Sequence, residues 1–212
     1  MNPHQITADF ERELCKYTGA PMCVVTTSCT MALLLALMWF RRECGPQTIN
    51  IPKRTYVGVG MSILNAGHSI SFRDEMWLGE YALLPFPLYD SARRMTSGMW
   101  RPGSIQTLSF HWTKCLPIAQ GGAILLDDPV ADEYLRRIRF DGRRAGVAPA
   151  ADTFDVLGMH AYMSPSDAAE GITRLATLPK RNADLPWSDY SDLSLAPIFS
   201  GNRQKIVAEA AE

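Results

Sequence analysis

The feature that most constrains the fold is an alternation of short apolar runs with helical patterns. In the first third of the chain, apolar runs at 22–25, 48–51 and 69–72 are separated by helical patterns at 31–42 and 56–65. Strands that alternate with helices favour an α/β sheet with parallel strands. We therefore expect a mostly parallel central sheet flanked by helices.

The rest of the chain continues this pattern less regularly. Apolar spacing and boundary residues indicate strands at 105–110 and 122–126, and helices at 6–17 with Thr7 as N-cap, at 129–139 and from Ser164-Pro165. The stretch 83–89 is apolar but contains two prolines, which weaken a strand assignment.

The length and composition allow one domain with an extension. We expect a reduced large domain at 1–178 and an extension at 179–212 that ends in a helix-prone tail, IVAEAAE. Apolar residues make up 47% of the 212 residues and charged residues 20%, as in soluble globular proteins. The net charge of −1 leaves no basic footprint for nucleic acid, and the longest apolar run, 31–40, is too short to span a membrane.

The five cysteines show neither paired nor metal-binding spacing. None forms a C-x-x-C pair, and the four histidines do not cluster with them, so no metal site is expected. An odd number of cysteines fits reduced thiols, and the N-terminal stretch MNPHQITADFERELCK is too charged for a signal peptide. These observations predict a cytoplasmic protein.

The turn Thr27-Ser28-Cys29-Thr30 joins a predicted strand to a predicted helix. Small hydroxyl residues at a helix start present hydroxyl and backbone N–H donors in the positive potential of the helix dipole. The turn therefore either binds a phosphate or serves as an ordinary N-cap, and by itself the pattern favours the N-cap.

Asp90 ends the apolar stretch that precedes it. Ligands of α/β sheets bind beyond the carboxyl ends of the strands, where a carboxylate can hold a protonated pyridine nitrogen. By itself the position favours a structural role, in which Asp90 caps residues 91–93 or pairs with Arg93 or Arg94.

Lys114 follows the predicted strand at 105–110 and precedes a glycine pair. A lysine in this position can form a Schiff base, whereas most loop lysines are simply exposed. His111 could act with Ser109 or Cys115 in a hydrolase, but the G-x-S-x-G context of such enzymes is absent from the sequence. The order of phosphate-type turn, aspartate and lysine strengthens the cofactor interpretation.

Several segments, in order, resemble the pyridoxal phosphate (PLP)-dependent sugar aminotransferases of the DegT/DnrJ/StrS family. The resemblance covers about residues 10–175, and its most specific block is LSFHWTKCLPIAQGGAILLDD. The other matching segments are FERELCKYTGAP, TTSCTMALLLAL, IPKRTYVGVGMSILNAG, YDSARR, RIRFDGRR and LGMHAYMSPSDAAEGITRL. The resemblance implies the PLP-dependent transferase fold, here reduced in size.

The resemblance also implies roles for individual residues. Lys114 would carry the cofactor as a Schiff base and move the proton in transamination, and Asp90 would pair with the pyridine nitrogen. Tyr56 would stack on the cofactor ring, and the phosphate would be held by Ser28, Cys29, Thr30 and Ser109. His160 matches a position that reaches the phosphate from the partner subunit, which implies a homodimer with shared active sites.

The sequence also departs from the family pattern. Cys29 replaces a glycine, Arg93 replaces the Gln or His that supports the cofactor ring, and Asp141 and Tyr162 replace a His and an Arg. The segment 72–89 is shortened by about one β-α unit, and the extension at 179–212 stands in place of the small domain.

Two functions therefore remain open. The first is a minimal aminotransferase that passes an amino group from a glutamate-like donor to a keto-sugar or nucleotide-linked keto-sugar. The alternative is a non-catalytic, dimeric PLP-binding or scaffold remnant. We favour the enzyme because Lys114 and Asp90 are both retained.

Overall fold

A computed structural model describes residues 3–187 and 189–200; the tail with the helix-prone sequence IVAEAAE lies outside these ranges. The helices are α1 (Pro3–Thr18), α2 (Cys29–Cys44), α3 (Val57–Asn65), α4 (Pro129–Ile138) and α5 (Pro165–Thr177). The strands are β1 (Met22–Thr26), β2 (Thr48–Pro52), β3 (Ser69–Arg73), β4 (Tyr81–Ala82), β5 (Leu88–Asp90), β6 (Ile105–Ser109) and β7 (Gly122–Leu126). Short 3-10 helices occur at Pro149–Ala151, Leu193–Leu195 and Pro197–Phe199.

The central sheet is mixed. Its order is β1-β7-β6-β5-β4, and only the β5–β6 pair within it is parallel. A parallel pair, β2–β3, lies beside it and is linked by a bridge between Asn50 and Leu84. The predicted α/β class is confirmed, but the expectation of a mostly parallel central sheet needs correction. β4 and β5 are joined by residues 83–87 and β6 and β7 by residues 110–121, and strands joined directly in this way can pair antiparallel without a crossover helix.

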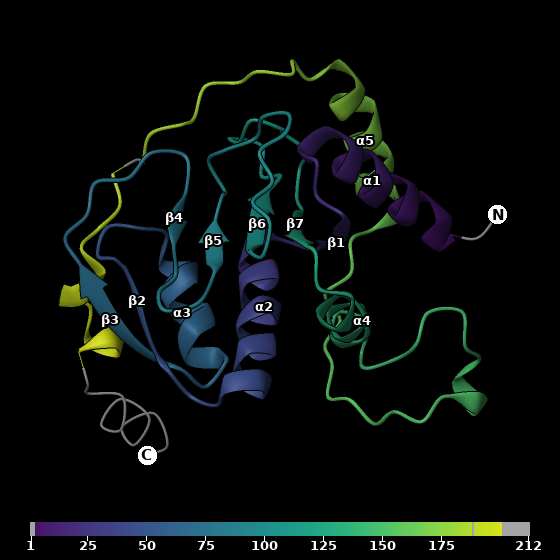
Figure 1. Cartoon of the computed structure of the whole chain (residues 1–212), viewed down its shortest axis with the longest axis horizontal. Helices are drawn as coiled ribbons and strands as arrows, with labels where there is room; N and C mark the ends of the chain where they lie inside the picture. The colour runs from purple at the N-terminus through teal and green to yellow at the C-terminus, as the bar shows by residue number, and fades with distance from the viewer. Residues whose placement is uncertain (1–2, 188, 201–212) are drawn as a thin grey trace.

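Helices cover both faces of this sheet (Figure 1). Along β1, Val24 packs in one core cluster with α2, α3 and α4, while Val25 packs in the other with α1 and α5. Ile124 and Leu125 of β7 divide in the same way. This alternation follows from the two-residue period of a strand and builds a three-layer core.

The helix boundaries follow the capping residues in the sequence. Ser28 caps α2, with its Oγ accepting the Met31 N–H at 3.1 Å, and Ser164 caps α5 in the same manner. Gly19 follows α1 with φ +83°, a conformation that favours glycine. The prediction of Thr7 as an N-cap was wrong, because α1 begins at Pro3 and proline is well tolerated in a first helical turn.

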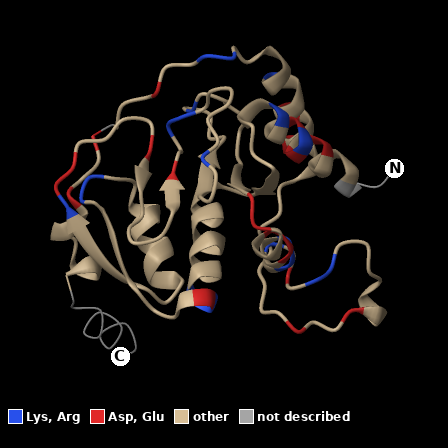
Figure 2. Ribbon diagram, viewed as in Figure 1, with Lys and Arg blue, Asp and Glu red and all other residues tan. Residues whose placement is uncertain are grey.

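We call residues 179–187 and 189–200 the C-terminal strap. The strap runs from α5 across the ends of the central strands to the region of β3 (Figure 1). Figure 2 shows that charged residues are concentrated on α1, on α4 and along the connections, whereas most of α2 and α3 is uncharged. In the described part of the chain, no helix is long and apolar enough to cross a membrane.

Candidate active site

A cavity of about 510 Å³ opens at one edge of the central sheet. Strands β1, β5 and β6 run in the same direction, so their carboxyl ends meet at this edge. Eight of the residues predicted to form the site line the cavity: Ser28, Cys29, Thr30, Tyr56, Asp90, Arg93, Ser109 and Lys114. The fold therefore brings together residues that lie up to 86 positions apart in the sequence.

The start of α2 lies in the cavity wall and has the chemistry to hold an anion, so we call it the anion cradle. The first N–H groups of a helix have no partner within the helix, and the helix dipole makes this end positive. Gly122, the first residue of β7, packs directly on this turn: a β-carbon there would lie 2.7 Å from the carbonyl oxygen of Ser28. Cys29 is accommodated as the first helical residue, so the β-carbon that replaces the family's glycine is tolerated there.

Asp90 is a buried acid at the end of β5, only 5% exposed. Its Oδ1 accepts the Ala92 N–H at 3.0 Å, and its Oδ2 accepts the hydroxyl proton of Tyr81 at 2.8 Å. Burial raises the pKa of Asp90 above the usual aspartate value, although these two donors and the charges of Lys114 and Arg93 act in the opposite direction. Asp90 thus caps the following turn and also presents a carboxyl group to the cavity.

Lys114 lies half-buried in the connection between β6 and β7. Its backbone N–H donates to the carbonyl of His111 at 2.8 Å, which fixes a tight turn beyond the end of β6. The side chain thus enters the cavity that also contains Asp90 and the α2 cradle. An amine and a buried acid in one cavity can hold a ligand between them.

Tyr56 stands at the mouth of this cavity, 53% exposed. A β-carbon on Gly58 would lie 2.6 Å from Cε1 of Tyr56 and 3.0 Å from Oγ1 of Thr30, so the tyrosine ring lies close against α3 and near the α2 cradle. The ring is therefore accessible for stacking on a flat ligand that spans the cavity.

Arg93 is held at the rim by the strap. Its guanidinium donates to the carbonyl of Pro186 at 2.6 Å and to the Tyr190 hydroxyl at 3.2 Å. The predicted alternative of an ion pair between Asp90 and Arg94 is wrong, because Arg94 pairs with Glu80 and Asp184.

His160 is the one predicted site residue outside this cavity. Its side chain is 68% exposed, its Nδ1 lies 3.1 Å from Oδ2 of Asp141, and its ring packs against Tyr162. The Asp141 and Tyr162 departures from the family pattern therefore meet at His160.

The cavity also has lining residues that local sequence patterns did not reveal. Thr55 lines it after β2, and Trp77 and Tyr190 form one wall, with their rings 6.4 Å apart and 11° from parallel. Thr55 lies in the matching segment IPKRTYVGVGMSILNAG, which assigned it no role, and Trp77 lies within the shortened stretch 72–89.

A hydrolase site is not supported around His111. Its Nδ1 bonds to the Thr113 hydroxyl at 2.9 Å rather than to a serine or cysteine nucleophile. Burial raises the pKa of the Cys115 thiol, which disfavours the reactive thiolate.

The cavity suits PLP on the chemistry of its donors and acceptors. An anion cradle suits the phosphate, an amine suits the aldehyde, and the buried Asp90 carboxyl suits a protonated ring nitrogen. Among the described residues, two strong donors and a weak Cys29 Sγ contact at 4.0 Å reach the Asp90 oxygens, so the carboxylate retains capacity to accept another hydrogen bond.

Comparisons with known proteins place the sequence and the fold of this chain. Residues 4–75 and 97–185 match the sequence model of the DegT/DnrJ/EryC1/StrS aminotransferase family, whereas 76–96 are not matched. No protein with a curated description matches the chain.

Among solved structures, the chain is similar to AtS13 from Actinomadura melliaura, with a TM-score of 0.70 and 20% identity over 82% of this chain and 60% of that one. It is also similar to PseC from Helicobacter pylori, an aminotransferase involved in pseudoaminic acid biosynthesis, with a TM-score of 0.68 and 17% identity over 82% and 58%. DesV from S. venezuelae, solved with a ketimine intermediate, gives a TM-score of 0.65 and 21% identity over 82% and 57%. The chain thus spans about 60% of the length of these proteins or slightly less.

Proposed function

The chain belongs to the DegT/DnrJ/EryC1/StrS aminotransferase family, and from that membership we propose that it is a PLP-dependent aminotransferase. It passes an amino group from a glutamate-like donor to a keto-sugar, free or linked to a nucleotide. The observation that carries the proposal is the presence of Lys114, Asp90 and the α2 cradle in one cavity. The small-molecule substrates and reduced thiols fit a cytoplasmic setting.

Each residue has a defined task in this proposal. Ser28, Thr30 and Ser109 with the Cys29 N–H hold the phosphate, and Tyr56 stacks on the ring. Bound PLP supplies an electron sink for the carbon that loses its proton. Lys114 holds the aldehyde carbon and, once its amine is released, moves a proton at Nζ. Asp90 holds the proton of the ring nitrogen at its carboxylate.

A cofactor-attachment experiment tests this assignment. Purified protein with PLP should show a visible absorption band, and borohydride reduction followed by mass spectrometry should locate the pyridoxyl group on Lys114. Lys114→Ala should abolish the band, whereas Lys16→Ala should not, because Lys16 pairs with Glu13 on α1 outside the cavity. A wild-type protein without the band would refute the proposal.

Glutamate distinguishes the enzyme from a non-catalytic remnant. Added glutamate should convert the bound cofactor to its amine form, with loss of the visible band. Asp90→Asn should retain attachment to Lys114 but slow this conversion by roughly 10²–10³-fold, because a preorganised charge is removed. A stable band that no amino acid changes would favour the scaffold alternative.

A homodimer with shared sites is part of the proposal. His160 lies outside the cavity of its own chain and is largely exposed, so it is available to the cavity of a second copy. Light scattering should show a dimer. Mixed dimers of Lys114→Ala and His160→Ala chains should regain one intact site and bind PLP more tightly than His160→Ala dimers. Equal affinity would place His160 outside the partner's site.

A further inference from the structure

Three polar side chains form a buried line that includes part of the cavity wall. The Thr55 and Tyr81 hydroxyl oxygens lie 2.6 Å apart, and the Tyr81 hydroxyl lies 2.8 Å from Oδ2 of Asp90. Their exposed fractions are 2%, 3% and 5%. Thr55 follows β2, Tyr81 opens β4 and Asp90 ends β5, so three separate segments meet in this line.

The polarity of the line follows from its carboxylate end. An ionised Asp90 can only accept protons, so Tyr81 must donate to Oδ2. The Tyr81 oxygen is then free to accept the hydroxyl proton of Thr55. Because the Ala92 N–H binds the other carboxylate oxygen, the Asp90 carboxyl plane is fixed from two directions.

We propose that Tyr81, supported by Thr55, is a positioning residue that keeps Asp90 ionised and oriented toward the pyridine nitrogen of the cofactor. This role rests on the proposed function, since it requires PLP in the cavity. Tyr81 lies in the stretch 76–96 that the family model does not match. The residue is therefore assigned from the geometry of this chain alone.

The surroundings of Asp90 explain why a donor is needed. Cys29 from α2 approaches it at 4.0 Å, and Lys114 and Arg93 contribute positive charge from the connections after β6 and β5. Burial raises the pKa of Asp90, and the Tyr81 hydrogen bond opposes that change. Burial and the Asp90 charge also raise the pKa of Tyr81 well above its usual value, so Tyr81 remains a proton donor.

Removal of the Tyr81 hydroxyl donor would change the charge of the bound cofactor ring. A buried carboxyl group without this donor has a higher proton affinity and would compete more strongly for the proton of a bound ring nitrogen. The ring would then carry less positive charge. Because a nearby positive charge lowers the pKa of another cationic acid, the imine nitrogen held by Lys114 would bind its proton more tightly.

The first arm of the test uses the protein without cofactor. Carbon NMR titration of the aspartate carboxyls, with Asp90→Asn to assign the signal, should show a higher Asp90 pKa in Tyr81→Phe. The expected rise is about one to two units, the size of one hydrogen bond to a charged group. Thr55→Val should raise the Asp90 pKa by a smaller amount. Thr55→Ser keeps the hydroxyl group and should leave the Asp90 pKa at the wild-type value. An unchanged Asp90 pKa in both Tyr81→Phe and Thr55→Val would overturn the proposal.

The second arm uses the PLP-loaded protein. The pH midpoint of the visible band should rise by about one unit in Tyr81→Phe. Tyr89→Phe is the matched control, because Tyr89 lies on β5 beneath the Arg101 guanidinium and does not line the cavity. Circular dichroism would verify that each variant folds. If Tyr81→Phe does not fold, the same midpoint is measured in Thr55→Val.

The two arms separate the possible failures. A wild-type band with an unshifted midpoint in Tyr81→Phe and Thr55→Val overturns the positioning role and leaves the proposed function intact. Absence of the band in wild-type protein overturns the proposed function and with it the role toward the ring nitrogen. In that case the first arm still shows whether the hydroxyl line sets the charge of Asp90.

Discussion

The backbone of Gly122, at the start of β7, packs directly against the backbone of Cys29, at the start of α2. A β-carbon on Gly122 would clash with the Cys29 nitrogen and with the carbonyl group of Ser28. Neither contact can be relieved by rotating a side chain, because both partners are main-chain atoms. The close approach holds the first turn of α2 against the sheet edge and so fixes the shape of the anion cradle.

Gly122→Ala should therefore damage both stability and cofactor binding. Overpacking at a rigid site costs about 1–3 kcal/mol in the free energy of unfolding, which urea denaturation would measure. Displacement of the cradle should weaken PLP binding by about tenfold or more.

Gly146→Ala is the control for the binding measurement. Gly146 has φ +80° but nothing within 4 Å of an added β-carbon, so its replacement should cost about 1 kcal/mol in backbone strain alone. Its PLP affinity should match that of the wild type. Wild-type PLP affinity in Gly122→Ala would show that the close packing is irrelevant to the cradle.

Tyr190 should matter for the acceptor substrate rather than for the cofactor. Its ring lies nearly parallel to that of Trp77, and the two rings form one wall of the cavity. The Tyr190 hydroxyl accepts a hydrogen bond from Arg93. Tyr190→Ala removes an aromatic face, so the KM for a keto-sugar acceptor should rise by about three- to tenfold. The visible band and the glutamate step should stay as in the wild type.

Phe154→Ala provides a comparison, because Phe154 is an exposed aromatic residue that does not line the cavity. It should change neither measurement. If Tyr190→Ala alters PLP attachment instead of the acceptor KM, the wall belongs to the cofactor site.

Local sequence patterns predicted the parts of the site that depend on local chemistry. The N-cap at Ser28 and the proline after Ser164 determine where α2 and α5 begin, and the apolar run at 122–126 coincides with β7. The apolar runs and their boundaries also indicated that Asp90 ends one apolar stretch and that Lys114 follows a strand. The predicted division at residue 178 stays a prediction.

Long-range relationships could not be predicted in this way. The direction of β7 depends on which neighbour it pairs with, and β4 has only two residues, too few for any period. For this reason no sequence pattern pointed to Tyr81 as a residue of the site. The stacking of Trp77 on Tyr190 joins residues 113 positions apart in the sequence, and no local pattern records such a contact.

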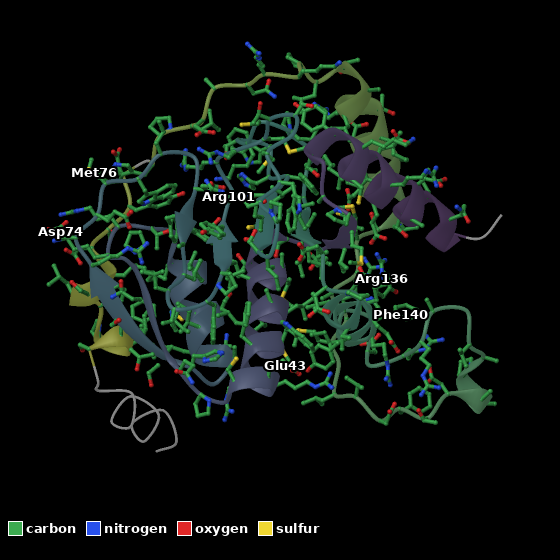
Figure 3. All side chains as sticks on the ribbon, in the orientation of Figure 1. Glu43, Asp74, Met76, Arg101, Arg136 and Phe140 are labelled. Carbon is green, nitrogen blue, oxygen red and sulfur yellow. The ribbon has the colours of Figure 1, made fainter. Side chains whose placement is uncertain are left out.

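Arg94 fixes the strap to the central sheet and should contribute measurably to stability. It binds the largely buried Glu80, which also binds Arg101 (labelled in Figure 3), and its Nε and Nη2 donate three hydrogen bonds to the carboxylate of Asp184 in the strap. Arg94→Met leaves both acids without this partner and should cost about 2–4 kcal/mol in urea denaturation. Faster amide hydrogen exchange should appear in the strap.

Arg174→Met is the matched control for Arg94→Met. Arg174 pairs with Glu170 within α5, and both side chains are nearly half exposed. Loss of such a pair should cost no more than about 0.5 kcal/mol. Similar losses in the two variants would mean that the Glu80–Arg94–Asp184 contacts do not fix the strap.

The environment of Glu11 predicts how the stability of the fold depends on pH below neutrality. The Glu11 side chain, 7% exposed, joins α1 to Arg136 of α4 and to Arg139, the residue that follows α4, and it accepts the Val25 N–H of β1 at 3.0 Å (Figure 3 labels Arg136). Burial by itself would raise the pKa of Glu11, but the two arginines and the Val25 N–H lower it below the ordinary value of 4.5. The folded protein therefore binds this proton less readily than the unfolded chain.

The sign of the pH dependence follows directly. The stability contributed by Glu11 is fully present above the unfolded pKa near 4.5 and is lost as the pH falls through the lower pKa of the folded state. Glu11→Gln should cost about 2–4 kcal/mol at pH 7, because two arginines lose their shared anion. The difference in unfolding free energy between Glu11→Gln and the wild type should narrow steadily as the pH falls below 4.5.

Glu13→Gln is the control. Glu13 lies on the exposed face of α1, so this change should alter stability by less than about 0.5 kcal/mol at any pH. A Glu11→Gln gap that stays constant down to pH 3 would mean that the ionised carboxylate does not hold α1 to the sheet.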